Sequence, residues 1–572
     1  MKSHRSLALA ATAFLAGTML ASPTPAAAAE VTPDRLVNAD REPQNWLMNH
    51  RTYNGQRFSP LDLVNKGNVK GLHLAFAVAL GGGAGNEYTV ATPLAEDGFL
   101  YTTDSWGVLY KIDVRAGDVG RIVWRMDPKQ ERQLRNRGAA LWGGFVISVA
   151  NYPPRAIATN KETGRVVWET NLSDGQPRVT FSAAPLAVKD KIIIGASGGD
   201  AGTRDFIAAV DAASGKPVWC KYVIPAPGEP GSETWKDNNN AWQTGGGAMW
   251  VTGSYDPATD QVLWGTGNPV PWSDPFYRPG DNLYTNSLIS WDADTGKMNW
   301  YHQYTPGDMW DYDEEGSSIL IDVTVDGQPR KVATHAARNG FIYTFERANG
   351  QTLMAKPYVS AVNWTKGIDQ KTGKPIDYDP NRDVQVYSGQ QNFTLTERTR
   401  KLCPSMGGGN NFFPPSYSKR TGLLYIPSLS SCNESTFDPE AMKKGIFFTR
   451  NNTQIERNES DIVMADPVTG DIKKRAHNIY PNVSGVLTTA GGLAFSGYED
   501  GTFIAYDDAT LDELWRINLG SGIDAPPMTF EAGGKQYVAI STGLSRVSKN
   551  KLTKTPELRD MRNQTTSFVF GL

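Results

Sequence analysis

The chain has 572 residues, a formal net charge of −3, 40% hydrophobic residues and 20% charged residues. This balance is typical of a globular protein and lacks the basic footprint of a nucleic-acid-binding protein. The 57 glycines, 35 prolines and 16 tryptophans favour short strands joined by tight turns.

Residues 1–29 have the pattern of a secretory signal. A basic start precedes an apolar run from Leu7 to Ala21, and a stretch of alanines ends at Ala29. The apolar run is short for a bilayer span. We therefore expect a cleaved signal peptide and a periplasmic protein, with an uncleaved anchor as the alternative. Residues 30–572 are expected to form one domain.

A repeat recurs along the rest of the chain. Each copy has an Asp or Asn, then a Thr/Ser-Gly turn, and a Trp eight positions after the first residue. Copies occur at 160–168, 211–219, 256–264, 292–300 and 507–515, with weaker copies at 113–124, 346–354 and 466–474. The residues before the turn alternate as in a strand, and the Trp opens the next strand. One hairpin cannot bury its own apolar face, but several arranged radially can. The repeat predicts an all-β propeller of about eight blades with tryptophan-docking repeats. Unrelated hairpins in a β-sandwich are the alternative.

Two irregular segments, 225–247 and 358–409, are rich in Pro, Asn, Asp and Gly. In a propeller such insertions gather on one face and build the active site. The three cysteines of an exported chain predict one disulfide and one thiol. Cys403 and Cys432 lie in turn-rich stretches where two loops could meet, whereas Cys220 follows an apolar run and is predicted to be a buried thiol. The sequence has no Cys-x-x-Cys-His motif for covalent haem.

Three motifs carry chemistry. They are Gly265-Thr-Gly-Asn-Pro-Val-Pro-Trp272, Gly307-Asp-Met-Trp-Asp-Tyr-Asp313 and Gly195-Ala-Ser-Gly-Gly-Asp-Ala-Gly-Thr-Arg204. Taken singly, the first and third are typical of plain turns and the second of a solvated acidic loop. Trp310 indicates instead that the acidic loop is partly buried.

Together these motifs resemble the quinoprotein alcohol dehydrogenases, the family of the methanol and ethanol dehydrogenase large subunits, over nearly the whole chain after the signal. The resemblance implies the cofactor pyrroloquinoline quinone (PQQ) and one metal ion. It makes Asp311 the general base and a metal ligand, with Asn268 and Asp200 as further ligands. The family usually has Glu at the position of Asp200, which leaves the coordination number open.

Asp313 bears on the identity of the metal. The position is typically small and uncharged in calcium-using members and is an Asp in lanthanide-using members. The resemblance therefore favours the lanthanide branch (La³⁺ or Ce³⁺), because a trivalent ion tolerates more negative charge. A Ca²⁺ site with a spectator Asp313 is the alternative, since calcium also takes oxygen ligands.

The resemblance also implies a cofactor cradle. Trp250 would stack under the quinone, and Arg and hydroxyl donors suit the three carboxylates of PQQ. The expected contacts, carried over position by position, are Arg137, Ser182, Ser197, Gly198, Gly199, Trp250, Arg338, Asn411 and Glu87. Many members have two adjacent cysteines just before the equivalent of Asn136; this chain has none there, whereas Cys403 and Cys432 match another family disulfide.

The implied activity is oxidation of primary alcohols to aldehydes by hydride transfer to the quinone C5. Electrons would pass to a separate soluble cytochrome c. One alternative is a PQQ dehydrogenase for sugars, polyols or other bulky alcohols; a more distant one is a non-catalytic envelope scaffold. A homodimer is also compatible with the sequence, and neither nucleic acid nor a membrane span is expected.

Overall fold

The structure is a computed structural model that describes residues 29–81, 87–325, 327–388 and 391–572. The predicted signal peptide lies outside these ranges except for Ala29. Within the described ranges, none of the helices has the length and apolar character needed to cross a membrane. The architecture is all-β, as predicted: the only α-helices in this part of the chain are the one-turn α1 (Pro33–Val37) and α2 (Arg546–Asn550).

The strands form nine sheets in the described ranges, eight with four or five strands and one with three. The first four sheets each take four consecutive antiparallel strands. Their strands are β3 (Leu94–Glu96), β4 (Phe99–Thr103), β5 (Leu109–Asp113) and β6 (Arg121–Met126); β7 (Ala140–Trp142), β8 (Phe145–Ala150), β9 (Arg155–Asn160) and β10 (Val166–Asn171); β11 (Leu186–Val188), β12 (Lys191–Gly195), β13 (Phe206–Asp211) and β14 (Pro217–Tyr222); β15 (Ser254–Asp256), β16 (Gln261–Gly265), β17 (Ser287–Asp292) and β18 (Met298–Gln303).

The next four sheets continue the series, and two of them recruit strands from the start of the chain. Their strands are β19 (Ile319–Val325), β20 (Gln328–Ala336), β21 (Phe341–Glu346) and β22 (Thr352–Pro357); β24 (Ser416–Ser418), β25 (Leu423–Ser430), β28 (Glu459–Ala465) and β29 (Ile472–Asn478); β1 (Phe58–Ser59), β30 (Val486–Thr489), β31 (Leu493–Gly497), β32 (Thr502–Asp507) and β33 (Glu513–Asn518); β34 (Met528–Ala532), β35 (Lys535–Ser541), β36 (Thr566–Gly571) and β2 (His73–Ala79).

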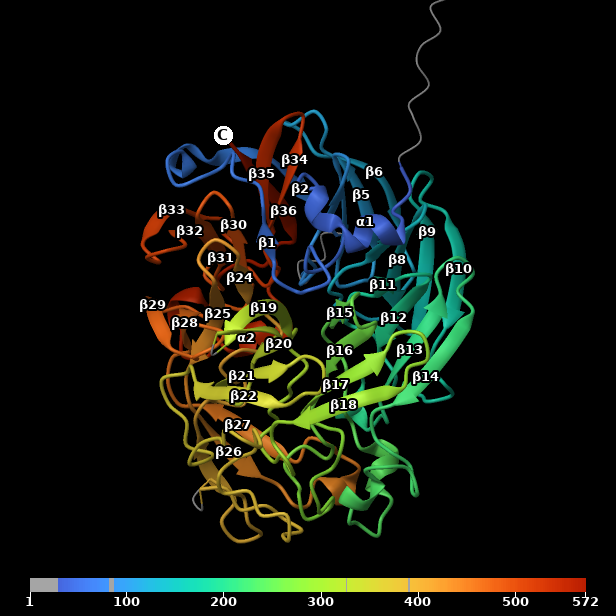
Figure 1. Cartoon of the computed structure of the whole chain (residues 1–572), viewed down its shortest axis with the longest axis vertical. Helices are drawn as coiled ribbons and strands as arrows, with labels where there is room; N and C mark the ends of the chain where they lie inside the picture. Colours follow the sequence, from blue (N-terminus) through green and yellow to red (C-terminus); the bar gives the residue numbers. More distant parts are fainter. Residues whose placement is uncertain (1–28, 82–86, 326, 389–390) are drawn as a thin grey trace, which may run out of the picture.

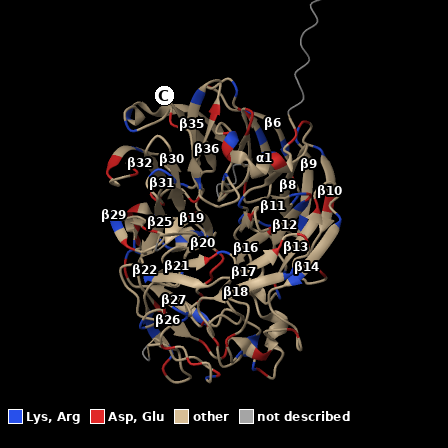
Figure 2. Ribbon diagram, in the orientation of Figure 1, with Lys and Arg blue, Asp and Glu red and all other residues tan. Residues whose placement is uncertain are grey.

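The sheets follow one another around a common centre (Figure 1). The ring is closed by strand β2, which pairs antiparallel with β36 from the other end of the chain. β1 adds a short parallel pairing to β30. An early strand and the last strand of the chain therefore lie side by side in one sheet. Acidic and basic residues are interspersed along the outer strands and loops (Figure 2), in keeping with the small net charge.

The repeat tryptophans connect one sheet to the next. Trp168 in β10 donates from Nε1 to the Ala212 carbonyl at 3.2 Å, in the turn after β13. Its ring lies against Gly215, where an added Cβ would be 2.5 Å from Trp168 Cε3. Trp219 makes the same contacts with the turn at Ala293 and Gly296. Trp264 differs: it lies in β16, the second strand of its sheet, and is fully buried.

In most of the four-stranded sheets the fourth strand is the most exposed. In the third sheet, β13 is buried along almost its whole length, whereas β14 alternates between exposed and half-buried positions. Cys220 lies in β14 and is exposed, so the predicted buried thiol is wrong. The apolar run around it packs on one face only, because β14 is an outer edge strand, and Val218 beside it is 46% exposed.

The irregular insertions lie at one end of the sheets. In an antiparallel sheet, the connection from the second to the third strand and the exit from the fourth strand are at the same end. Segment 225–247 leaves β14, and segment 358–409 leaves β22. The small ninth sheet consists of β23 (Thr399–Leu402), β26 (Asn433–Phe437) and β27 (Arg450–Gln454), all drawn from connections at this end.

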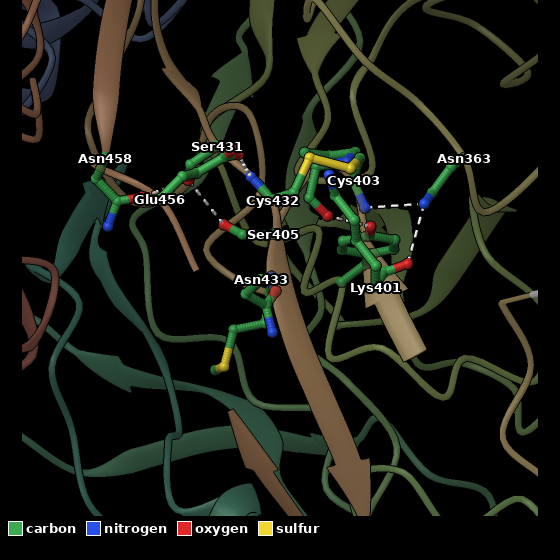
Figure 3. The surroundings of a disulfide bond; sticks show 12 residues. Asn363, Lys401, Cys403, Ser405, Ser431, Cys432, Asn433, Glu456 and Asn458 are labelled. Carbon is green, nitrogen blue, oxygen red and sulfur yellow. Dashed lines mark hydrogen bonds between the residues drawn. A yellow bond between two sulfur atoms is a disulfide. The ribbon is translucent and has the colours of Figure 1, made fainter. Parts of the chain in front are cut away.

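One disulfide fastens the ninth sheet. Cys403 directly follows β23 and is bonded to Cys432, which directly precedes β26, 29 residues later (Figure 3). The backbone N–H of Cys403 donates to Asn363 Oδ1 at 2.8 Å, and that of Cys432 donates to Glu456 Oε1 at 2.6 Å. The disulfide expected from the two turn-rich stretches is confirmed.

Candidate active site

Most of the site residues predicted from the sequence lie in connections at the same end of the sheets. Each comes from a different point around the ring, so the topology alone brings them to one face. The connections are β6–β7 for Arg137, β10–β11 for Ser182, β12–β13 for Ser197 to Asp200, β14–β15 for Trp250, β16–β17 for Asn268, β18–β19 for Asp311 and Asp313, β20–β21 for Arg338, and β23–β24 for Asn411.

An acidic cluster forms where four of these connections meet. Arg338 donates from Nη1 to Asp313 Oδ2 at 2.6 Å and from Nη2 to Asp311 Oδ2 at 3.1 Å. The backbone N–H of Asn268 donates to Asp313 Oδ1 at 2.5 Å. Asp200 accepts a hydrogen bond from Trp272 Nε1 at 2.7 Å. Asp311, Asp313 and Arg338 are buried, whereas Asp200 is exposed on one side although its carboxyl group is surrounded by protein.

The loop that carries Asp311 is held from within. The buried carboxylate of Asp308 accepts hydrogen bonds from the backbone N–H groups of Trp310 at 3.0 Å and Asp311 at 2.9 Å. It thereby holds Asp311 at a φ of 67°, a left-handed conformation that non-glycine residues adopt mainly where the surroundings enforce it. Trp310 is fully buried, as its position in the acidic run predicted.

Burial changes the proton affinity of the cluster. Burial raises the pKa of Asp311 well above its usual range; the charges of Asp313 and Asp200 add to this, and the guanidinium of Arg338 opposes it. Burial and the charge of Asp313 raise the pKa of Asp200 to about 7. Ionised carboxylates placed this close in a low-dielectric site need a neighbouring cation.

The donor set suits a hard cation. Four carboxyl groups lie near two guanidinium groups, those of Arg338 and Arg450. Three belong to the buried residues Asp311, Asp313 and Glu315, and the fourth to the more exposed Asp200. Both oxygens of Glu315 lack a hydrogen-bond partner among the described residues. Over the same part of the chain, no three His, Cys, Asp or Glu side chains converge as a ready-made metal cage. The oxygen donors and the surplus negative charge fit a metal ion. In this structure Arg338 contacts two of the expected ligands, Asp311 and Asp313.

A second cluster lies around Trp250. The guanidinium of Arg137 is 4.6 Å from the Trp250 ring centroid and donates from Nη1 to the Trp250 carbonyl at 3.0 Å. Ser182 Oγ lies 3.3 Å from Ser197 Oγ. Within the described residues, Arg137 Nε and Nη2 are buried without a hydrogen-bond partner. These free donors beside an aromatic ring fit a planar, anionic cofactor.

Tight backbone packing explains the adjacent glycines Gly198 and Gly199 of the third motif. A Cβ at Gly198 would lie 2.5 Å from the Arg178 carbonyl, and one at Gly199 would lie 2.9 Å from Asp205 Oδ2. The chain after β12 can therefore approach its neighbours closely, and the short 3₁₀ turn Gly199–Ala201 then presents Asp200. Asp205 is itself buried, and burial raises the pKa of its carboxyl group well above the usual range.

Two predicted contacts are less closely integrated. Asn411 Nδ2 donates to the Gly407 carbonyl at 3.1 Å, next to Phe412, whose ring lies 5.3 Å from the Arg137 guanidinium. Glu87 instead lines a hollow with Asp104 and Arg125, neither of which was predicted for the site. The structure thus assembles the expected metal ligands in one cluster and the expected stacking residues in another. It places Glu87 beside a different set of neighbours.

Sequence reasoning missed two charged residues of the site. Glu315 follows the acidic run by two positions and could have been added by extending that run beyond Asp313. Arg450 lies in β27 with its side chain fully buried, 3.7 Å from Asp311 Oδ2. No local pattern marks Arg450, because it reaches the site only through the folding of the ninth sheet.

Comparison with known proteins identifies the family. Residues 46–429 and 463–538 match the glucose/ethanol/alcohol dehydrogenase β-propeller domain that is designated PQQ. The chain is 36% identical to quinohemoprotein alcohol dehydrogenase ADH-IIG of Pseudomonas putida, over 94% of this chain and 77% of that protein. It is 34% identical to quinoprotein alcohol dehydrogenase PedH of the same species, over 91% of this chain and 89% of that protein.

A comparison with solved structures points to the same family. A europium-containing methanol dehydrogenase superposes with a TM-score of 0.84 at 30% identity, covering 94% of this chain and 100% of that one. The fold and the two clusters define a quinoprotein-type β-propeller. The chain belongs to the PQQ-dependent alcohol dehydrogenase family, a family of oxidoreductases.

Proposed function

We propose that the protein is a periplasmic PQQ- and metal-dependent dehydrogenase that oxidises primary alcohols to aldehydes and passes the electrons to a separate cytochrome c. The observation that carries the proposal is the pairing of two clusters on one face. Four carboxyl groups around Arg338, three of them on buried residues, lie on the same face as a buried arginine with unused donors beside Trp250. Family membership supports the same reaction class.

The finer architecture is part of the proposal. We assign each four- or five-stranded sheet to one blade, which gives eight blades in the described part of the chain. The docking tryptophan of each repeat would be the one in the fourth strand, as Trp168 and Trp219 are. The ninth sheet would then be an insertion over the active-site face rather than a blade.

Each cluster has a role in this scheme. Asp200, Asn268, Asp311 and Asp313 would hold the metal ion, while Arg137, Ser182, Ser197, Gly198, Gly199, Trp250, Arg338 and Asn411 would hold PQQ. When bound, PQQ supplies a two-electron acceptor at its C5 carbon and the metal ion supplies a Lewis acid. A lanthanide is favoured over Ca²⁺ because Asp313 adds a third carboxylate to the ligand set.

The chain's own residues handle the proton. Asp311 would accept the hydroxyl proton of the substrate, and Asp308 would keep its backbone fixed while it does so. Arg338 lies between Asp311 and Asp313, and its charge, together with that of a bound metal ion, would favour the ionised form of Asp311 against the effect of burial. Burial of the cluster would keep water away from the proton transfer. The electrostatic interactions between the charged groups would then be stronger than in water.

The test is dye-linked alcohol oxidation by purified, metal-free protein with added PQQ, and with La³⁺ or Ca²⁺ in parallel. We expect activity with La³⁺. Asp311→Asn should lower kcat by at least about 100-fold, the usual contribution of a general base, without changing the circular dichroism spectrum. Activity with Ca²⁺ alone would make Asp313 a spectator. No activity with any alcohol under either metal would favour the scaffold alternative.

A further inference from the structure

Arg450 has hydrogen-bond donors that the protein does not use. Its side chain is 0% exposed, and within the described residues Nε and Nη1 have no hydrogen-bond partner. Nη2 contacts Met406 Sδ at 3.7 Å and lies 3.7 Å from Asp311 Oδ2. Asp311 lies closer to Arg338, at 3.1 Å, than to Arg450. The carboxylate of Asp311 therefore satisfies little of the hydrogen-bonding capacity of the Arg450 guanidinium.

The surroundings of Arg450 are firmly built. Its guanidinium lies 5.8 Å from the Trp272 ring centroid. The preceding residues are fastened to the same loop, because Trp272 N–H donates to the Phe447 carbonyl at 3.2 Å and Ser273 N–H donates to Thr449 Oγ1 at 3.0 Å. The arginine is therefore held in place by backbone contacts on its own segment.

Met406, which contacts Arg450, is fixed by the ninth sheet. Met406 N–H donates to Asn433 Oδ1 at 2.8 Å, which anchors the methionine beside β26. A buried guanidinium with two unused nitrogens costs free energy unless a ligand supplies acceptors. Arg137, with Trp250 and Phe412, forms the cluster proposed for the cofactor, whereas Arg450 contacts Trp272, Met406 and Asp311. The unused donors of Arg450 therefore lie beside the proposed base.

We propose that Arg450 is a specificity-determining residue that binds a second oxygen of the substrate, next to the hydroxyl group that is oxidised. Vicinal diols, polyols and sugars carry such an oxygen; simple alkanols do not. A neutral oxygen suits the site better than a carboxylate, since Asp200, Asp311, Asp313 and Glu315 already make it rich in negative charge. The inference rests on the proposed dehydrogenase function and narrows its substrate class.

The experiment compares two matched primary alcohols, 1,2-propanediol and 1-propanol, as substrates of the PQQ- and metal-loaded enzyme. Wild type should favour the diol in kcat/KM. Arg450→Met keeps an unbranched apolar stem but removes the guanidinium group and its donors. Because the charge of Arg450 also lies beside Asp311, its removal can slow both alcohols; beyond that shared effect, kcat/KM for the diol should fall by a further factor of about 10 to 100, the range for a lost hydrogen bond to a charged group.

Two further variants separate recognition from structure. Arg450→Lys retains a charge and one donor group, so it should recover part of the diol activity. Arg457→Met removes a partly exposed arginine that pairs with Glu557, and it should change neither substrate. The affinity of the metal-free protein for PQQ, followed by quenching of tryptophan fluorescence, should be the same in Arg450→Met and wild type.

The outcomes distinguish this inference from the proposed function. If wild type oxidises both alcohols and Arg450→Met loses both equally, Arg450 only positions Asp311 and the inference is wrong. A weaker affinity for PQQ in Arg450→Met would assign the arginine to the cofactor and would also overturn it. If wild type oxidises neither alcohol, the proposed function itself fails, and the substrate inference fails with it.

Discussion

Individual side chains at the site carry more charge than their neighbours neutralise. Asp313 illustrates this, because its two oxygens accept from Arg338 and from the backbone of Asn268 while Asp200 and Glu315 add like charge nearby. A buried acid elsewhere in the chain can be fully paired: Glu96 contacts both Lys161 at 2.7 Å and Arg35 at 2.9 Å. The surplus at the site is consistent with binding of a cation.

Removing one unit of that charge should weaken metal binding. Asp313→Asn keeps the size of the side chain but takes one carboxylate from the proposed ligand set. We expect the dissociation constant for La³⁺ to rise at least about tenfold, because affinity for hard cations depends on the number of charged ligands. Isothermal titration of metal-free, PQQ-loaded protein would measure it. Asp294→Asn, at an exposed acid paired with Lys189 and Lys191, is the control. Equal affinities in wild type and Asp313→Asn would show that Asp313 is no ligand.

Residues of the site were predictable where a motif and the loop topology coincide. Asp311, Asn268 and Arg338 each follow a strand at the same end of the sheets, so their sequence context indicated both chemistry and place. Arg450 could not be found this way. It lies in an insertion whose strands pair with each other rather than with a repeat, and only the tertiary contact with Trp272 brings it to the site.

The repeating element is a sheet whose outer tryptophan packs on the next sheet's turn. Gly215 has a φ of 71°, and a Cβ there would lie 2.5 Å from Trp168. Gly175 has a similar φ of 73° but nothing within 4 Å of an added Cβ. The two glycines therefore share the backbone requirement and differ in the close contact of Gly215 with Trp168 and Thr170.

This difference allows a matched test. Gly175→Ala should cost about 1–2 kcal/mol from the left-handed backbone alone. Gly215→Ala should cost a further 1–3 kcal/mol or so, because the methyl group displaces the Trp168 ring. In a chain of this length each kcal/mol corresponds to about 1 °C in melting temperature, which scanning calorimetry can resolve. Identical shifts for the two variants would mean that the Trp168–Gly215 contact does not stabilise the ring.

The same element explains what the repeat could and could not predict. The spacing from Asp to Trp fixed the third and fourth strands in most copies, because a hairpin turn sets both register and strand order. The 256–264 copy has the same spacing but spans the first and second strands, so Trp264 is buried instead of docked. Cys220 was misplaced for a related reason: an apolar run does not reveal which strand of a sheet is the outer edge.

At the scale of the whole molecule, the ring divides the chain into a scaffold and one functional face. Strand β2 closes the ring against β36, and the disulfide fastens the insertion that covers the site. The sequence predicted the ring because every repeat needs neighbours to bury its apolar faces. It could not predict how the ninth sheet assembles from segments more than 30 residues apart in the chain, such as β23 and β26, since such pairings leave no periodic pattern.

Buried histidines should make the stability of this scaffold depend on pH. His302 lies in β18 against the rings of Tyr304 and Phe345, 5.1 Å and 4.6 Å away between centroids. Burial, with a smaller contribution from the charge of Lys374, lowers the pKa of His302 to about 3 from 6.5. Between these two values the unfolded chain binds a proton that the folded protein does not, so the free energy of unfolding rises with pH across this window and falls as acid is added.

Replacing His302 with Phe should remove its share of this pH dependence while keeping an aromatic ring among aromatic neighbours. The histidine should contribute about 2 kcal/mol to the loss of stability between pH 7 and pH 5. Urea unfolding of wild type and His302→Phe at both pH values isolates that share, because any effect of ring size is present at both and cancels in the difference. The buried carboxyl groups titrate alike in the two proteins and cancel as well. A variant whose stability falls by as much as wild type between pH 7 and pH 5 would show that His302 is not held neutral by the fold.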